Sequence, residues 1–237
     1  MHPMSIRKLN LALLLCIVFS CSNTPRMELT GRVNDLKKGT IYLQKIQDST
    51  LIVVDSVSID GEPDFNFSTP ISSPEVFYLT LKKNDTNSLI ERMPFFAEAK
   101  PMSITTSLSR FGVEATITGS ENQAKLEQYQ KILKRYQDRN LEYIEHLLEA
   151  QTKGDTAKTA AITNQQDKLL ARKYLATVNF ALQNASLEVA PYLLISDAYG
   201  VNRSLADTVY KSLTPKVKTS LYGKMLDAYI QQLDSIN

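Results

Sequence analysis

The chain has 237 residues and 43% of them are hydrophobic, so it is long enough and apolar enough to bury a core. Its formal charge is +2, and without the first twenty residues, which carry Arg7 and Lys8 but no acid, 25 basic residues balance 25 acidic ones. A neutral surface of mixed charge lacks the basic footprint of a nucleic-acid-binding protein, so we expect no nucleic-acid partner. Both cysteines lie near the N-terminus, which leaves no CxxC pair and no zinc-type cluster.

The N-terminal residues predict export and lipid attachment. Arg7 and Lys8 precede an apolar run, residues 9–19, that is too short to span a bilayer as a stable helix. The next residues, Val18-Phe19-Ser20-Cys21, resemble the lipobox of bacterial lipoproteins, in which the cysteine receives diacylglycerol. This pattern predicts a signal peptide over residues 1–20, acylation (palmitate) at Cys21 and a polar tether over 21–26. An ordinary signal peptide with an incidental cysteine is the alternative.

Residues 27–119 have an all-β pattern. Short runs rich in β-branched and aromatic residues alternate with clusters of Gly, Pro, Asn and Asp. So many short antiparallel strands must each bury one face, which favours a β-sandwich. Pro94 lies inside a run and therefore predicts an edge strand or a bulge. The expected strands are residues 27–33, 40–46, 51–59, 64–68, 76–82, 89–98, 102–108 and 113–118.

The alternating pattern gives way to helical spacing after Gly119. Ser120 or Asn122 can cap the helix that follows, and Gln123 stands three residues after Ser120, which is the spacing of a capping box. This connection is too short for a flexible linker, so we expect the two halves to form one cooperative unit. The apolar stripe nearest the connection, which we expect to be buried, carries Leu126 and Leu133.

Residues 120–237 predict a helical domain. A long amphipathic helix over 122–152, a break at Gly154-Asp155 and a second helix over 156–185 indicate an antiparallel hairpin. Further helices are expected at 189–199, at 204–213 with a serine cap, and from Pro215 to 233, where Gly223 is a candidate interruption. The expected fold class is therefore α+β, an N-terminal antiparallel β-sandwich followed by an α-helical hairpin or bundle.

Residue types that commonly carry out catalysis are sparse in this chain, and a structural role accounts for each of them. Tyrosines spaced by seven residues suit a half-buried seam better than a stacking platform, and Trp is absent. His146 and the carboxylates around it have the mixed charge of an ordinary exposed helix face. We therefore expect no catalytic residue, no metal site and no cofactor. The residues considered are Tyr129, Tyr136, Tyr143, Tyr192, Tyr199, Tyr222, Tyr229, Glu142, Glu145, His146 and Glu149.

Five Asp-Ser/Thr-aliphatic tripeptides match the acceptor pattern of a bacterial envelope O-glycosylation system. The pattern has only three residues, and several of the sites also suit turns or helix caps. Glycosylation and capping both remain open for them. The tripeptides begin at Asp48, Asp55, Asp155, Asp207 and Asp234.

The chain resembles the N-terminal part of envelope lipoproteins of the TlpA/ResA-like thiol:disulfide interchange (thioredoxin-like) group. The resemblance is carried by segments such as Leu29-Thr30-Gly31-Arg32-Val33 and Ile117-Thr118-Gly119-Ser120-Glu121-Asn122, and it extends over the mature chain. It implies an uncharacterised β-sandwich, a helical region and then a thioredoxin domain with a Trp-Cys-x-x-Cys motif. That motif has no counterpart before the last residue, Asn237, so we expect the redox activity not to carry over. Other resembling segments are Thr40-Ile41-Tyr42-Leu43, Asp55-Ser56 through Asp60-Gly61, Phe65-Asn66-Phe67, Tyr78-Leu79-Thr80-Leu81, Pro191-Tyr192-Leu193-Leu194 and Ser220-Leu221-Tyr222-Gly223-Lys224.

These observations favour a non-catalytic cell-envelope lipoprotein that binds or scaffolds. The expected location is the outer membrane, facing the periplasm or the cell surface, with contact to the membrane through the lipid and to a protein partner in the envelope. The partner would be a thioredoxin-like redox protein to which this chain is accessory, or one that supplies the thioredoxin-like domain. The alternative is a hydrolase or isomerase with its site in the cleft between sandwich and helices. A cleft carboxylate of raised pKa would favour that alternative.

Overall fold

The computed structural model describes residues 24–83 and 91–235, and it confirms the α+β class with eight strands followed by six helices. Cys21, the predicted signal peptide, most of the tether and residues 89–90 of the sixth predicted strand lie outside the described residues. The strands are β1 Arg26–Asn34, β2 Lys38–Gln47, β3 Thr50–Asp60, β4 Asp64–Pro70, β5 Glu75–Lys82, β6 Glu91–Ala97, β7 Pro101–Ser107 and β8 Ala115–Thr118. The helices are α1 Glu121–Thr152, α2 Thr156–Gln183, α3 Val189–Asp197, α4 Arg203–Ser212, α5 Pro215–Thr219 and α6 Leu221–Ser235.

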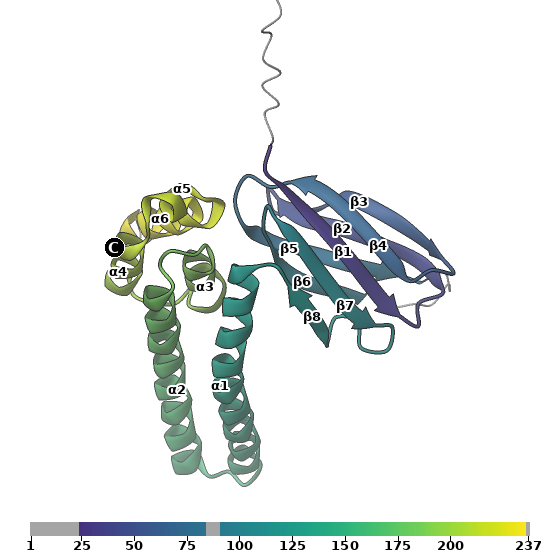
Figure 1. Cartoon of the computed structure of the whole chain (residues 1–237). Helices are drawn as coiled ribbons and strands as arrows, with labels where there is room; N and C mark the ends of the chain where they lie inside the picture. Colours follow the sequence, from purple (N-terminus) through teal and green to yellow (C-terminus); the bar gives the residue numbers. More distant parts are fainter. Residues whose placement is uncertain (1–23, 84–90, 236–237) are drawn as a thin grey trace, which may run out of the picture.

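The strands form two four-stranded sheets, in the orders β4-β1-β7-β8 and β3-β2-β5-β6 (Figure 1). Neighbouring strands are antiparallel except for β1 and β7, which are parallel. The expected antiparallel sandwich is therefore confirmed in its main features, and the parallel pairing of β1 with β7 is the one departure among the described strands. The chain enters β7 from the other sheet rather than through a hairpin, so no tight turn sets the direction of β7 relative to β1.

The core of the sandwich lies between the inner faces of the two sheets. Alternation is complete in β4, where Phe65 and Phe67 are buried and Asn66 is exposed. In β6, Pro94 is exposed on an edge strand, where its missing N–H removes no ladder bond, as predicted. The core side chains include Met27, Leu29, Val33, Ile41, Leu43, Phe65, Phe67, Phe77, Leu79, Leu81, Phe95, Met102 and Ile104.

Helix α1 begins where β8 ends, through a turn that only glycine fits. Gly119 has φ +93°, and a Cβ at this position would lie 2.3 Å from the carbonyl oxygen of Pro101. Ser120 is the N-cap, and its Oγ accepts a bond from the Gln123 N–H at 3.0 Å. The turn therefore fixes the direction in which α1 leaves the sandwich.

The long helices α1 and α2 run antiparallel and project from the rest of the protein as an arm (Figure 1). The shorter helices α3 to α6 pack beside the base of this arm. Within the described residues, no helix combines the length and the apolarity that crossing a membrane requires.

Two expected helix boundaries are wrong. Helix α4 is capped by Asn202, whose Oδ1 accepts from the Leu205 N–H, and not by Ser204. The last predicted helix is divided at Ser220 into α5 and α6, so Gly223 does not interrupt it. Gly223 instead lets α6 approach α5, because a Cβ there would lie 2.0 Å from the carbonyl oxygen of Val217.

Candidate functional site

The sandwich and the helices meet in an apolar interface, which we call the seam. Phe96 of β6 is fully buried there, and its ring lies 5.5 Å from that of Tyr192 and 5.7 Å from that of Tyr222, both edge-to-face. The preceding residue, Phe95, points into the sandwich core, so the end of β6 is covered on both faces. The buried residues of the seam are Val76, Phe96, Leu126, Tyr129, Phe180, Val189, Leu193 and Tyr222.

Backbone N–H groups of β5 and of the edge strand β6 donate hydrogen bonds to side chains of the helices. The N–H of Val76 donates to the Tyr222 hydroxyl at 2.8 Å, and the N–H of Phe96 donates to Gln123 Oε1 at 2.8 Å. The predicted capping box is therefore only half formed, because the Gln123 side chain reaches strand β6 instead of the Ser120 N–H. These bonds hold strands β5 and β6 against the helices.

A buried polar network continues the seam beyond its apolar part. Glu98 is 6% exposed, and its Oε1 accepts from the Ser120 hydroxyl at 2.7 Å and from the Asn122 N–H at 2.8 Å. The Asn122 side-chain amide donates to the same oxygen at 3.1 Å, and Glu98 Oε2 pairs with Lys100 Nζ at 2.7 Å. One carboxylate thus joins the loop after β6 to the first turn of α1.

The Glu98 carboxyl is held in its charged form. Burial raises its pKa, but the hydrogen bonds from Lys100, Asn122 and Ser120 favour the carboxylate and lower the pKa below its ordinary value of 4.5. A general acid needs the opposite shift, since it must keep its proton near neutral pH. This environment suits a structural anion better than a proton donor.

Glu188, which precedes α3, lies next to this network. It is 2% exposed, and its Oε2 accepts from the Asn122 amide at 3.1 Å. Asn122 therefore bridges two buried carboxyl groups, while its own Oδ1 accepts from the Val189 N–H at 2.7 Å. Glu188 Oε1 has no hydrogen-bond partner among the described residues.

The network borders a cavity of about 460 Å³ at the end of the sandwich from which the helices leave. Loops from both halves line it, together with the start of α1 and residues of α5. Its charged lining consists of three acidic and two basic side chains, Glu98, Glu121, Glu188, Lys100 and Lys216. A cavity therefore exists where the sequence suggested a cleft between sandwich and helices.

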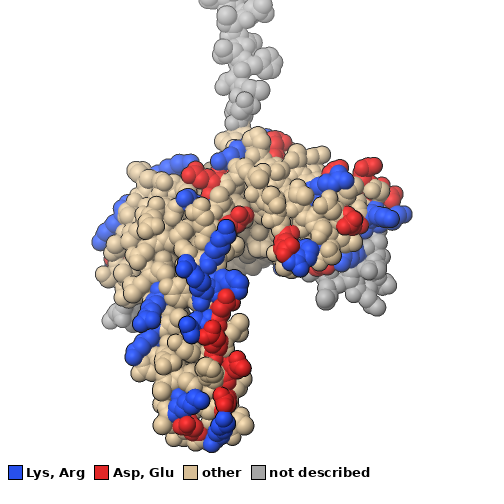
Figure 2. Space-filling model, turned by 60° about the horizontal axis from the view of Figure 1, so that its bottom comes forward, with Lys and Arg blue, Asp and Glu red and all other residues tan. Residues whose placement is uncertain are grey.

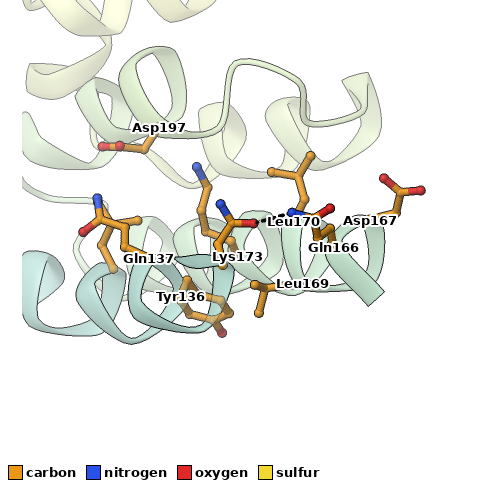
Figure 3. Close-up of a pocket in the computed structure, with 10 residues that line it drawn as sticks. Tyr136, Gln137, Gln166, Asp167, Leu169, Leu170, Lys173 and Asp197 are labelled. Carbon is orange, nitrogen blue, oxygen red and sulfur yellow. Dashed lines mark hydrogen bonds between the residues drawn. The ribbon is translucent and has the colours of Figure 1, made fainter. Parts of the chain in front are cut away.

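A second cavity, of about 480 Å³, lies farther along the helices. Tyr136 of α1 and Leu169 of α2 line it, and Asp197 faces it from the end of α3 (Figure 3). Gln166 of α2 donates to Asn140 of α1 at 3.3 Å within this cavity (Figure 3). The lining has no carboxyl pair or nucleophile and base in hydrogen-bond contact, so it has no arrangement for acid–base chemistry.

Three of the tyrosines that the sequence singled out, Tyr129, Tyr192 and Tyr222, meet at the seam, where the rings of Tyr192 and Tyr222 lie 5.0 Å apart. Tyr129 is buried at the seam, its hydroxyl bonds to Thr177 Oγ1 at 2.8 Å, and burial raises its pKa to about 12. Tyr222 is also buried, whereas Tyr199 is 64% exposed. His146 and the carboxylates around it are exposed on α1, and no group of three or more possible metal ligands occurs in residues 24–83 and 91–235.

The two buried carboxylates of the seam network were not predicted as site residues. Glu98 follows the unbroken run Phe95-Phe96-Ala97, and Glu188 lies between Leu187 and Val189, so each carboxylate adjoins a buried apolar segment. An acidic residue in such a position is rare unless it is paired. That juxtaposition is the only local signal that could have identified them.

One comparison with known families gives a match. A family model described as "Domain of unknown function (DUF4369)" matches residues 27–126, which cover the sandwich and the first turn of α1. No curated protein and no solved structure matches the chain. The strand half is thus similar to an uncharacterised domain.

Proposed function

We propose that the chain is a non-catalytic envelope lipoprotein that binds a protein partner through the arm formed by α1 and α2. The observation that carries the proposal is a row of exposed apolar side chains on the outer half of α1, which we call the arm stripe. It consists of Leu141, Ile144 and Leu148, at steps of three and four residues. Leu141 is 63% and Leu148 59% exposed, so the fold leaves most of each side chain uncovered.

The arm stripe has the form of a helical docking surface. Side chains at this spacing lie on one face of a helix, where they match a groove in a partner. Acidic side chains accompany it, Glu142, Glu145 and Glu149, and Figure 2 shows acidic groups following one side of the projecting arm. Glu142 pairs with Arg139 and Glu149 with Lys153, so a basic partner would exchange these exposed ion pairs for its own. A complementary partner would present an apolar groove bordered by Lys or Arg.

The proposed partner is a thioredoxin-like redox protein of the envelope. The support is the resemblance of this chain to the N-terminal part of TlpA/ResA-like proteins, in which a thioredoxin domain follows the helical region. A hydrolase or isomerase at the seam has less support, because the lowered pKa of Glu98 is unsuited to a general acid.

The arm stripe gives a direct test. Leu148→Asp is expected to weaken crosslinking to a thioredoxin-like partner in cells by about tenfold or more, because a charge replaces an apolar contact at the interface. The matched control is Leu175→Asp, which changes a leucine of α2 that is also about half exposed. Partners are identified by mass spectrometry after crosslinking in living cells. Equal crosslinking of both variants, or the absence of a thioredoxin-like protein from the crosslinked products, would contradict the proposal.

Lipid attachment at Cys21 has its own test. A fatty-acid analogue is expected to label the wild-type chain and to leave Cys21→Ala unlabelled, because Val18-Phe19-Ser20-Cys21 provides one acceptor sulfur. Two or three acyl chains anchor stably, since each buried methylene contributes about 0.8 kcal/mol. Cys16→Ala is the control, because Cys16 lies in the predicted signal peptide and should not affect labelling. Equal labelling of the wild type and Cys21→Ala would contradict the interpretation of the chain as a lipoprotein acylated at Cys21.

A further inference from the structure

The Glu188 side chain combines burial with an unused hydrogen-bonding atom. The residue is 2% exposed and lines the cavity of about 460 Å³ beside the polar network, which we call the seam cavity. Its Oε1 nevertheless contacts no donor in the described part of the chain. Buried carboxyl oxygens without a partner are rare in native proteins, because the lost hydration is not replaced. Something that donates a hydrogen bond is therefore expected beside this atom.

We propose that the seam cavity binds a primary ammonium group, which donates to Glu188 Oε1. The charges favour a cation, since the cavity lining carries three acidic side chains and only two lysines. The Lys100 ammonium is already paired with Glu98. A primary ammonium has three N–H donors and forms short, charge-assisted bonds to a carboxylate.

The place of the cavity suggests where such an ammonium group comes from. Pro25 lines the cavity and immediately precedes β1. Cys21 is four residues earlier, and four residues span at most about 14 Å. If Cys21 is acylated, the cavity lies near the membrane surface, where ethanolamine headgroups carry primary ammonium groups. This choice of source rests on the proposed lipid anchor, whereas the binding of the ammonium group does not.

The solution test compares two headgroup fragments on the purified protein. Phosphoethanolamine is expected to bind saturably in isothermal titration calorimetry, and phosphocholine about tenfold more weakly or not at all. The two fragments differ only at the nitrogen. The primary ammonium of phosphoethanolamine has N–H groups to donate, whereas the quaternary nitrogen of phosphocholine has none. Equal binding of the two, or no binding of phosphoethanolamine, would overturn the proposal and leave water as the partner of Glu188.

Variants locate the bound group. Glu188→Gln is expected to weaken phosphoethanolamine binding by about tenfold, because the amide is uncharged. Glu75→Gln is the matched control, since Glu75 is also buried but pairs with Lys45 outside this cavity. Ser72→Trp places a ring at an exposed position of the cavity lining and should weaken binding while Glu188 stays intact. Unchanged binding in both Glu188→Gln and Ser72→Trp would contradict the assignment.

Vesicles distinguish the two sources of the ammonium group. A lipid source predicts that the protein protects phosphatidylethanolamine in vesicles from an amine-reactive reagent, whereas Glu188→Gln does not. Binding of phosphoethanolamine without this protection would assign the cavity to a free amine. If Cys21→Ala is still labelled by the fatty-acid analogue, the proposed lipid anchor at Cys21 is contradicted. The calorimetric test of ammonium binding at Glu188 does not depend on that result.

Discussion

Phe96→Ala is expected to lower the free energy of unfolding by about 3–5 kcal/mol, the usual range for truncating a buried Phe. Phe96 is fully buried and contacts Tyr192 and Tyr222, so its removal leaves a cavity between the sandwich and the helices. Because the seam joins the two halves, strands and helices should lose stability together. Thermal unfolding followed by circular dichroism measures the loss, and hydrogen exchange resolved by segment shows where it occurs.

The neighbouring Phe95 provides the matched comparison. It is also fully buried, but it belongs to the sandwich core and not to the seam. In one cooperative unit, Phe95→Ala weakens exchange protection in the helices as well as in the strands. If the helices keep their full protection in Phe95→Ala while the strands lose theirs, the two halves unfold independently.

Local patterns predicted the elements of this fold well. Each of the eight predicted strands has its counterpart in the structure, because alternation such as Phe65-Asn66-Phe67 reports directly that one face of a strand is buried. The first helix was equally clear, since Ser120 and the apolar spacing after it specify a start and a buried face. The predicted break at Gly154-Asp155 also lies between α1 and α2.

Contacts between distant residues were not predictable in the same way. Strands β1 and β7 are parallel neighbours, and no local pattern encodes the pairing of strands so far apart in sequence. Leu126 is buried as expected, but Leu133 is only partly buried, because α1 extends away from the sandwich as part of the arm. The stripe on a helix indicates which side is apolar, but it does not show how far a neighbour covers it.

The polar network of the seam was not predictable either, because it also consists of contacts between residues far apart in sequence. Asn122 was considered only as a helix cap, whereas its side chain bridges Glu98 and Glu188. These three residues come from a strand end, a helix start and a loop, and only the tertiary fold brings them together. Sequence alone therefore predicted a seam, but not the polar residues within it.

Glu98→Gln is expected to destabilise the protein by about 1–3 kcal/mol at neutral pH and to flatten the fall of stability in acid. The native environment lowers the pKa of Glu98 below 4.5, so the unfolded chain binds a proton on this residue more readily than the folded one. The stabilisation is therefore fully present above the unfolded pKa and is lost as the pH falls through the native pKa. Glutamine does not titrate, so the stability of the variant lacks this dependence on pH.

Chemical denaturation between pH 7 and pH 3 measures this difference. The stability of the wild type should decrease more steeply below pH 4.5 than that of Glu98→Gln, so the two curves approach each other in acid. Glu62→Gln is the control, because Glu62 is exposed in the loop between β3 and β4 and lies outside the Glu98 network, so its curve should follow the wild type. Parallel curves for wild type and Glu98→Gln would mean that Glu98 is not held as a carboxylate by Lys100, Ser120 and Asn122.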